Sequence, residues 1–197
     1  MLFECRCSRR QLTDETRYPG TCRDRAPGGP DPAALRVRVE SRRIVVPDRV
    51  QGPVESDLAA AGGDFIVKRR DGIIAYALAV VVDDAAQGVT DIVRGADLLE
   101  STPQQIYLQN LLGLPTPTYA HLPVLVEADG RKLAKSERSV HLDPGTATLQ
   151  LHRVFGLLGL PARPAFRGES VAKAWRWALA HWDLALVPRR FSSPMPP

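Results

Sequence analysis

Short alternations of apolar and polar residues in the first part of the chain predict β-strands. Across residues 34–40, apolar residues alternate with charged ones, which is the period of two expected of a half-buried strand. Two further short strands are expected at residues 44–46 and 65–67, where β-branched and aromatic residues gather. Sequence rich in Gly, Pro and Asp separates them. We therefore expect residues 1–70 to be rich in β-structure.

The next part of the chain predicts an α/β unit. Residues 73–82 form a long apolar run closed by two aspartates, and we expect its Ala-rich first half to be helical and its Val-rich end to be a strand. Residues 92–95 predict a short strand that stops at Gly95, and Thr102 is expected to N-cap a helix over residues 103–112. In sheets of this kind, ligands gather at the carboxyl ends of the strands.

The last third of the chain predicts one more strand and a small helical cap. The strand is expected at residues 122–126, ahead of a basic loop at residues 131–136. Apolar residues recur at helical spacing over residues 148–160 and 170–182. Residues 191–197 are rich in Pro and Ser, and we expect them to fray.

Length and composition favour a globular protein. A chain of 197 residues with 44% hydrophobic content fits one domain with a small appendage. No run approaches the ~18 apolar residues of a membrane helix, and the first ten residues lack the apolar stretch of a signal peptide. We therefore expect a soluble, cytoplasmic protein with no membrane partner. The net charge of +4 permits a polyanionic partner without requiring one.

All of the cysteines lie near the start of the chain: Cys5, Cys7 and Cys22. An odd number cannot close into a disulfide framework without a leftover thiol. Three thiolates favour a structural Zn²⁺ site, which takes four protein ligands and leaves no open position for a substrate. No histidine is near, so by chemistry alone the fourth ligand could be any one of three carboxylates: Asp14, Glu15 or Asp24. Three reduced thiols without a metal are the alternative.

The basic loop carries the second chemical signal, Lys132, Lys135 and Ser136. Ammonium groups suit ATP because they neutralise the charge that develops on the phosphates as pyrophosphate leaves. Taken alone, this segment is better explained as an exposed, solvated loop.

Its context changes that interpretation. The segment 132–136 resembles the KMSKS loop of class I aminoacyl-tRNA synthetases, and residues 76–84, 87–99 and 119–123 precede it in the order seen in the second half of the glutamyl-type catalytic domain. The cysteine region, with the string Tyr-Pro-Gly-Thr-Cys at residues 18–22, resembles the zinc site of glutamyl-queuosine tRNA(Asp) synthetases.

This resemblance implies roles for individual residues. It makes Tyr76 and Arg94 the glutamate-binding pair, and an arginine fork does match a carboxylate bidentately. Without the resemblance, Tyr76 would be interpreted as a core aromatic. The resemblance makes Lys135 the ATP-contacting residue within the catalytic loop, and Tyr18 the fourth zinc ligand beside the three cysteines.

The implied fold is α/β, the C-terminal part of a Rossmann-like class I catalytic domain. A zinc-binding β-rich insertion would occupy residues 1–70 and the second half of the catalytic domain residues 71–146. A short all-helical region would follow at residues 147–190 and a disordered tail at residues 191–197.

The implied function is activation of glutamate with ATP in the absence of tRNA, followed by its transfer to queuosine at the wobble position of tRNA(Asp). The complete protein is expected to be a monomer. Because the family's HIGH-like motif is not found, we expect this chain to be a fragment that is inactive alone. The alternatives are a truncated ordinary glutamyl-tRNA synthetase and an inactive, zinc-stabilised tRNA-binding remnant.

Overall fold

The computed structural model describes residues 1–12, 17–40, 42–126, 132, 143–161, 169–190 and 192–194. The chain divides into two compact units. The first unit comprises Met1–Pro47, Pro53–Ile92 and Glu100–Thr118, and the second comprises Asp48–Gly52, Val93–Leu99 and Tyr119–Pro197. Every helix among the described residues is too short or too polar to cross a bilayer.

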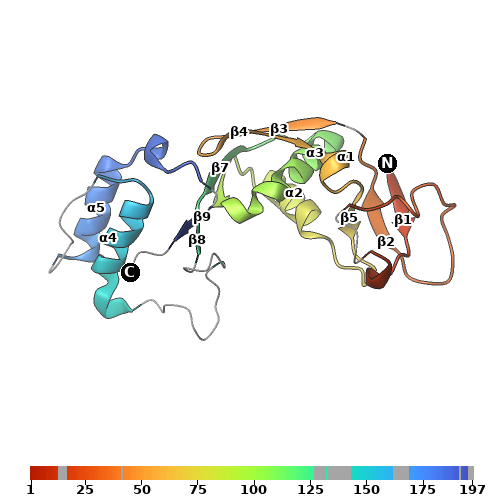
Figure 1. Cartoon of the computed structure of the whole chain (residues 1–197), viewed down its shortest axis with the longest axis horizontal. Coiled ribbons are helices and arrows are strands. Elements are labelled where there is room, and N and C mark those ends of the chain that lie inside the picture. Colours follow the sequence, from red (N-terminus) through yellow and green to blue (C-terminus); the bar gives the residue numbers. More distant parts are fainter. Residues whose placement is uncertain are drawn as a thin grey trace. The chain divides into compact units, whose positions relative to one another are not determined.

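A three-stranded sheet organises the first unit (Figure 1). Strand β2 (Ala34–Val37) lies between β1 (Leu2–Cys5) and β5 (Phe65–Lys68), and both pairings are antiparallel. The strands expected near residues 34–40 and 65–67 are therefore confirmed, although β2 ends before residue 38.

A two-stranded sheet joins β3 (Arg43–Asp48) to β4 (Gly52–Asp57). Buried and exposed residues alternate along β3, which confirms the strand expected at residues 44–46. Strand β4 was not predicted, because its sequence GPVESD contains a single β-branched apolar residue. Asp57 then accepts the N–H groups of the next turn and caps helix α1 (Leu58–Ala61).

Helix α2 (Tyr76–Ala86) corrects the expectation for residues 73–82. The Val-rich end is helical and not a strand, and the helix continues through Asp83 and Asp84. Ala77 and Val81 are its buried residues. They lie four positions apart and so share one helical face. Burial of that face outweighs the local β-preference of three consecutive valines.

Helix α3 (Thr102–Leu112) confirms the helix expected at residues 103–112. Its N-cap is Ser101 and not Thr102, and no side chain caps it. The ring of Tyr107 lies edge-on to that of Phe65 in β5, with 6.5 Å between their centroids. Aromatic packing of this kind fixes α3 on the sheet.

Among the described residues, the remaining strands form two two-stranded sheets. Strand β6 (Asp91–Gly95) pairs with β7 (Thr118–Leu122), which confirms the strand that stops at Gly95. Strand β8 (Val124–Val126) pairs in parallel with β9 (Ser192–Pro194). The strand expected at residues 122–126 is therefore split at Pro123. The expectation that the tail frays is wrong for Ser192–Pro194, because ladder hydrogen bonds hold them.

Helices α4 (Ala147–Leu157) and α5 (Val171–His181) confirm the two helices expected near the end of the chain. Phe155, Leu160, Ala174 and Ala178 form the buried cluster between them. Gly159 adopts φ 82°, a conformation that favours glycine. Short 3₁₀ segments complete the described elements: η1 (Arg9–Gln11), η2 (Ala96–Ser101), η3 (Pro144–Thr146) and η4 (Leu184–Leu186).

Candidate functional site

Three thiols meet in the first unit. Cys5 is the last residue of β1 and pairs with Ala34, while Cys7 and Cys22 come from the loop that follows. Their sulfur atoms all lie within 4.8 Å of one another, and 3.6 Å separates Cys7 Sγ from Cys22 Sγ. All three are free thiols. The fold thus collects the three soft donors that the sequence predicts as metal ligands.

The phenol of Tyr18 points into this thiol cluster. Its oxygen accepts a hydrogen bond from the Cys22 N–H at 2.9 Å and lies 3.5 Å from Cys5 Sγ. Tyr18 is buried, and the Arg36 guanidinium carbon lies 3.9 Å from its ring centroid. The carboxylate alternative Asp24 points elsewhere: it is 84% exposed and pairs with an arginine at 3.0 Å. The other two alternatives, Asp14 and Glu15, lie outside the described residues.

Two of the thiols, Cys5 and Cys7, have unequal acidities. Burial opposes ionisation of Cys5, but hydrogen bonds from Tyr18 and Arg36 outweigh it and lower its pKa to about 7. Burial and the two neighbouring sulfurs raise the pKa of Cys7 to about 11. Burial, together with the hydrogen bond to Cys5, also raises the pKa of Tyr18. The Cys5 thiolate therefore forms more readily than that of Cys7, and a bound cation would favour ionisation of Cys7 by offsetting the negative charge.

Two arginines near the thiols, Arg69 and Arg70, bind other groups of the protein. Both line a cleft of about 790 Å³ that is also lined by Cys5 and Cys7. Arg69 pairs with Asp71 at 2.6 Å, and Arg70 donates to the backbone oxygens of Arg6 and Cys7 at 2.8 and 3.1 Å. Arg70 thus braces the loop that carries Cys7.

In the second unit, Arg94 lies near the carboxyl end of β6. Its Nε donates to His121 Nε2 at 3.0 Å, and its guanidinium carbon lies 5.4 Å from the centroid of the Tyr119 ring. The next residue, Gly95, has no room for a side chain, because a Cβ there would lie 2.9 Å from Val124 Cγ1. Arg94 is therefore held by a hydrogen bond and an aromatic face, next to a backbone position where only glycine fits without displacing Val124 or Asp97.

Behind Arg94, a carboxylate holds His121. Asp48 Oδ2 is 2.5 Å from His121 Nδ1, and both side chains are fully buried. Burial would raise the pKa of Asp48, yet hydrogen bonds from Gln51, His121 and Val50 bring it below its ordinary value. Asp48 is consequently ionised near neutral pH.

The residues of the basic loop are only partly described. Lys132 forms an isolated bridge with Val126, and its Nζ pairs with the Asp97 carboxylate while remaining largely exposed. Lys135 and Ser136 lie outside the described residues. The structure therefore gives a partner for one lysine of the predicted loop.

Tyr76 is the first residue of α2 and belongs to the first unit, whereas Arg94 belongs to the second. Tyr76 is 51% exposed, so it is not a core aromatic.

The match to a protein family decides what these groups belong to. Residues 9–160 match the model described as tRNA synthetases class I (E and Q), catalytic domain. The chain belongs to this class I synthetase family. Class I synthetases use ATP, which agrees with the expected ligase chemistry.

Two curated relatives of this class I synthetase chain are named glutamyl-Q tRNA(Asp) synthetase. The protein of Aromatoleum aromaticum is 48% identical over 202 residues, covering 99% of this chain and 64% of its own length. The protein of Pseudomonas paraeruginosa is 49% identical over 195 residues, covering 98% of this chain and 66% of its own length. The chain therefore spans about two thirds of the length of these relatives, or slightly less.

Solved structures show the same fold. A glutamate tRNA ligase from Elizabethkingia meningosepticum, in complex with its amino acid, matches with a TM-score of 0.70 at 17% identity. The match covers 99% of this chain and 47% of that one. The glutamate-tRNA synthetase from Elizabethkingia anophelis gives the same TM-score at 19% identity, covering 98% and 47%. The expected α/β fold of the synthetase catalytic domain is confirmed at this level.

Two buried residues of this class I synthetase chain were missed as functional candidates. Asp48 ends a strand whose sequence predicts only packing, and His121 was noted only as part of a family string. The available signal was His121 two positions after Tyr119 in β7, which puts an aromatic and a titratable ring on one face of the strand. No local pattern pairs either residue with Arg94.

Proposed function

We propose that the complete gene product activates glutamate with ATP and transfers it to queuosine in tRNA(Asp). The observation that carries this proposal is the 48–49% identity, over nearly the whole chain, with relatives named glutamyl-Q tRNA(Asp) synthetase. The thiol cluster with its inward-facing tyrosine supports the same assignment.

In the activation step, a glutamate carboxylate oxygen bonds to the α-phosphorus of ATP as the bond to pyrophosphate breaks. Arg94 and Tyr76 bind the amino acid, with the arginine neutralising a carboxylate. Lys132, Lys135 and Ser136 act on the phosphates, where positive charge stabilises the departing pyrophosphate. For Lys132, this role means exchanging the Asp97 carboxylate for a phosphate oxygen. Queuosine then accepts the glutamyl group and AMP leaves.

The thiol cluster fits a structural zinc ion. Three thiolates and one oxygen donor supply the four ligands of a closed Zn²⁺ site, and the sulfur atoms already lie within 4.8 Å of one another. Cys5, Cys7, Cys22 and Tyr18 are the proposed ligands. Four protein ligands leave no position for a substrate, so the ion stabilises the region and takes no part in the reaction.

Two assays on the complete gene product test the proposed function. Glutamate-dependent exchange of pyrophosphate into ATP, without tRNA, measures activation. Labelled glutamate is then offered with queuosine-containing tRNA(Asp), with tRNA(Asp) that lacks queuosine and with tRNA(Glu). We expect label on the first acceptor alone. Label on tRNA(Glu) would identify an ordinary glutamyl-tRNA synthetase, and absence of exchange would identify an inactive remnant.

Matched arginine variants make this test specific to the proposed site. Arg94→Ala removes the carboxylate-binding group, and loss of a charged hydrogen-bond pair is expected to lower kcat/KM for glutamate by about 100-fold. Arg176→Ala, on the exposed face of α5, removes the same charge and should leave kcat/KM unchanged. Equal effects of the two variants would contradict the assignment of Arg94.

A further inference from the structure

A buried carboxylate–imidazole pair stands behind Arg94 in the second unit. His121 Nδ1 lies 2.5 Å from Asp48 Oδ2, and both side chains are 0% exposed. On the opposite side of the ring, Arg94 Nε donates to His121 Nε2 at 3.0 Å. The three side chains come from β3, β6 and β7, so the fold aligns groups from three separate segments.

The donor and acceptor chemistry fixes the hydrogen on His121. An arginine Nε–H can only donate, so His121 Nε2 must carry the lone pair. The hydrogen of the neutral ring therefore lies on Nδ1 and is donated to the Asp48 carboxylate. Burial holds the pKa of His121 below its ordinary value; Asp48 opposes this effect and Arg94 adds to it. The contacts thus require one neutral tautomer.

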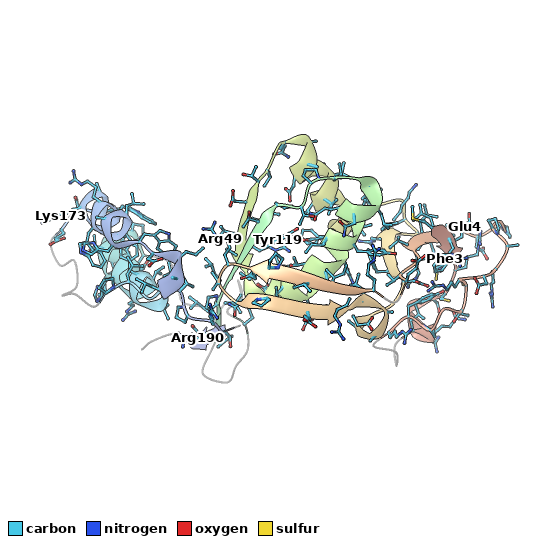
Figure 2. The ribbon with its side chains drawn as sticks, turned by 90° about the horizontal axis from the view of Figure 1, so that it is seen from above. Phe3, Glu4, Arg49, Tyr119, Lys173 and Arg190 are labelled. Carbon is cyan, nitrogen blue, oxygen red and sulfur yellow. The ribbon has the colours of Figure 1, made fainter. Side chains whose placement is uncertain are left out.

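Asp48 is itself fixed by backbone donors. Its Oδ1 accepts the N–H groups of Val50 and Gln51 at 2.9 and 2.8 Å, and its Oδ2 accepts the His121 N–H at 3.1 Å. The turn after β3 is tied to β7, since the backbone N–H of Arg49 donates to the backbone carbonyl oxygen of Tyr119 at 2.9 Å. Figure 2 shows these two residues side by side. The imidazole therefore rests on a rigid support.

We propose that Asp48 and His121 are positioning residues that set the direction of the Arg94 guanidinium for a carboxylate of the amino-acid substrate. This inference rests on the proposed function. The Tyr119 ring adds a second constraint, because it stacks on His121 with centroids 5.9 Å apart and faces the Arg94 guanidinium carbon. A hydrogen bond at Nε and an aromatic face together define the plane of the guanidinium group.

Substitutions at His121 separate positioning from packing. His121→Ala removes the acceptor for Arg94, whereas His121→Gln can present an amide oxygen near the position of Nε2. Loss of a hydrogen bond to a charged group predicts a rise of about 10-fold to 100-fold in KM for glutamate in His121→Ala. His121→Gln should recover most of this loss. In both variants the KM for ATP should stay unchanged.

Asp48→Asn tests the tautomer directly. Both Asp48 oxygens accept N–H donors, so the NH₂ group of an asparagine must face a donor on one side. Turned toward His121, it moves the ring hydrogen to Nε2, where it opposes the Arg94 Nε–H. We therefore expect Asp48→Asn to raise the KM for glutamate as His121→Ala does, although the shape of the side chain is retained.

The experiment combines glutamate-dependent pyrophosphate exchange with ¹⁵N NMR on the complete gene product. The NMR spectrum should show His121 protonated at Nδ1 only, and an Arg94 Nε–H that exchanges slowly with water and becomes fast in His121→Ala. His181→Ala, an exposed histidine on α5, is the control and should change neither readout.

The outcomes separate the two proposals. If wild-type protein activates glutamate but His121→Ala keeps the wild-type KM for glutamate, the positioning role is wrong. A proton on Nε2 of His121, or a fast-exchanging Arg94 Nε–H in wild type, would also overturn it. If the NMR results hold but no glutamate-dependent exchange occurs, the arrangement stands as a holder of Arg94 and the proposed function fails.

Discussion

Gly95 offers a sharp test of how Arg94 is held. A Cβ at this position would lie 2.9 Å from Val124 Cγ1 and closer still to the Asp97 carboxylate. Both neighbours have other contacts, since Val124 lies in β8 and Asp97 pairs with Lys132. Overpacking of this kind costs about 1–3 kcal/mol. Gly95→Ala should therefore lower the free energy of unfolding by that amount and displace the adjacent arginine.

Urea unfolding and pyrophosphate exchange measure the two effects of Gly95→Ala separately. We expect a lower unfolding midpoint with an unchanged m-value, and a KM for glutamate raised by about 10-fold if 1.4 kcal/mol of binding is lost. Gly62→Ala is the matched control, because a Cβ there meets nothing within 4 Å. If Gly95→Ala unfolds at the control's midpoint and the KM for glutamate is unchanged, the tight packing around Gly95 does not affect the position of Arg94.

Three further expectations concern the metal, pH and ATP. Elemental analysis should give about one zinc per chain. Cys22→Ser should reduce the zinc content to near zero, and Asp24→Asn should leave it unchanged. Loss of zinc in Asp24→Asn would instead identify that carboxylate as a ligand. Burial lowers the pKa of His121 below the ordinary histidine value of about 6.5. Just below that pH, His121 is therefore protonated in the unfolded chain and still neutral in the folded chain. The free energy of unfolding should then fall by up to about 1.4 kcal/mol per pH unit as pH drops through this window, and a slope that persists in His121→Gln would refute this origin. Lys132→Ala should raise the KM for ATP and not that for glutamate in the exchange assay, and the reverse pattern would place this lysine at the amino acid.

The local spacing of apolar residues was sufficient to predict elements that bury one face against an element nearby in sequence. The alternation over residues 34–40 and the helical spacing over residues 148–160 both correspond to observed elements. It failed where packing outweighs propensity, as in the valines at the end of α2. It also failed for Ser192–Pro194, whose partner strand β8 is distant in sequence, so no local signal marks the pairing.

The candidate site divides in the same way. Cys5, Cys7 and Cys22 could be selected from the sequence because thiols are rare and close spacing suggests shared use. Arg94 could be selected because the residues around it resemble the glutamyl-type catalytic domain, in which this arginine binds glutamate. The pair of Asp48 and His121 could not be found, because its meaning depends on hydrogen-bond directions between side chains that only the folded chain brings together.

The 3.6 Å between Cys7 Sγ and Cys22 Sγ also affects how the protein must be handled. Two thiols at this separation need little movement to oxidise to a disulfide when no cation holds them apart. That bond would consume two of the proposed donors and leave Cys5 unpaired. Metal-stripped samples kept in air should lose two hydrogens in mass and fail to reload, and treatment with a reductant should restore uptake.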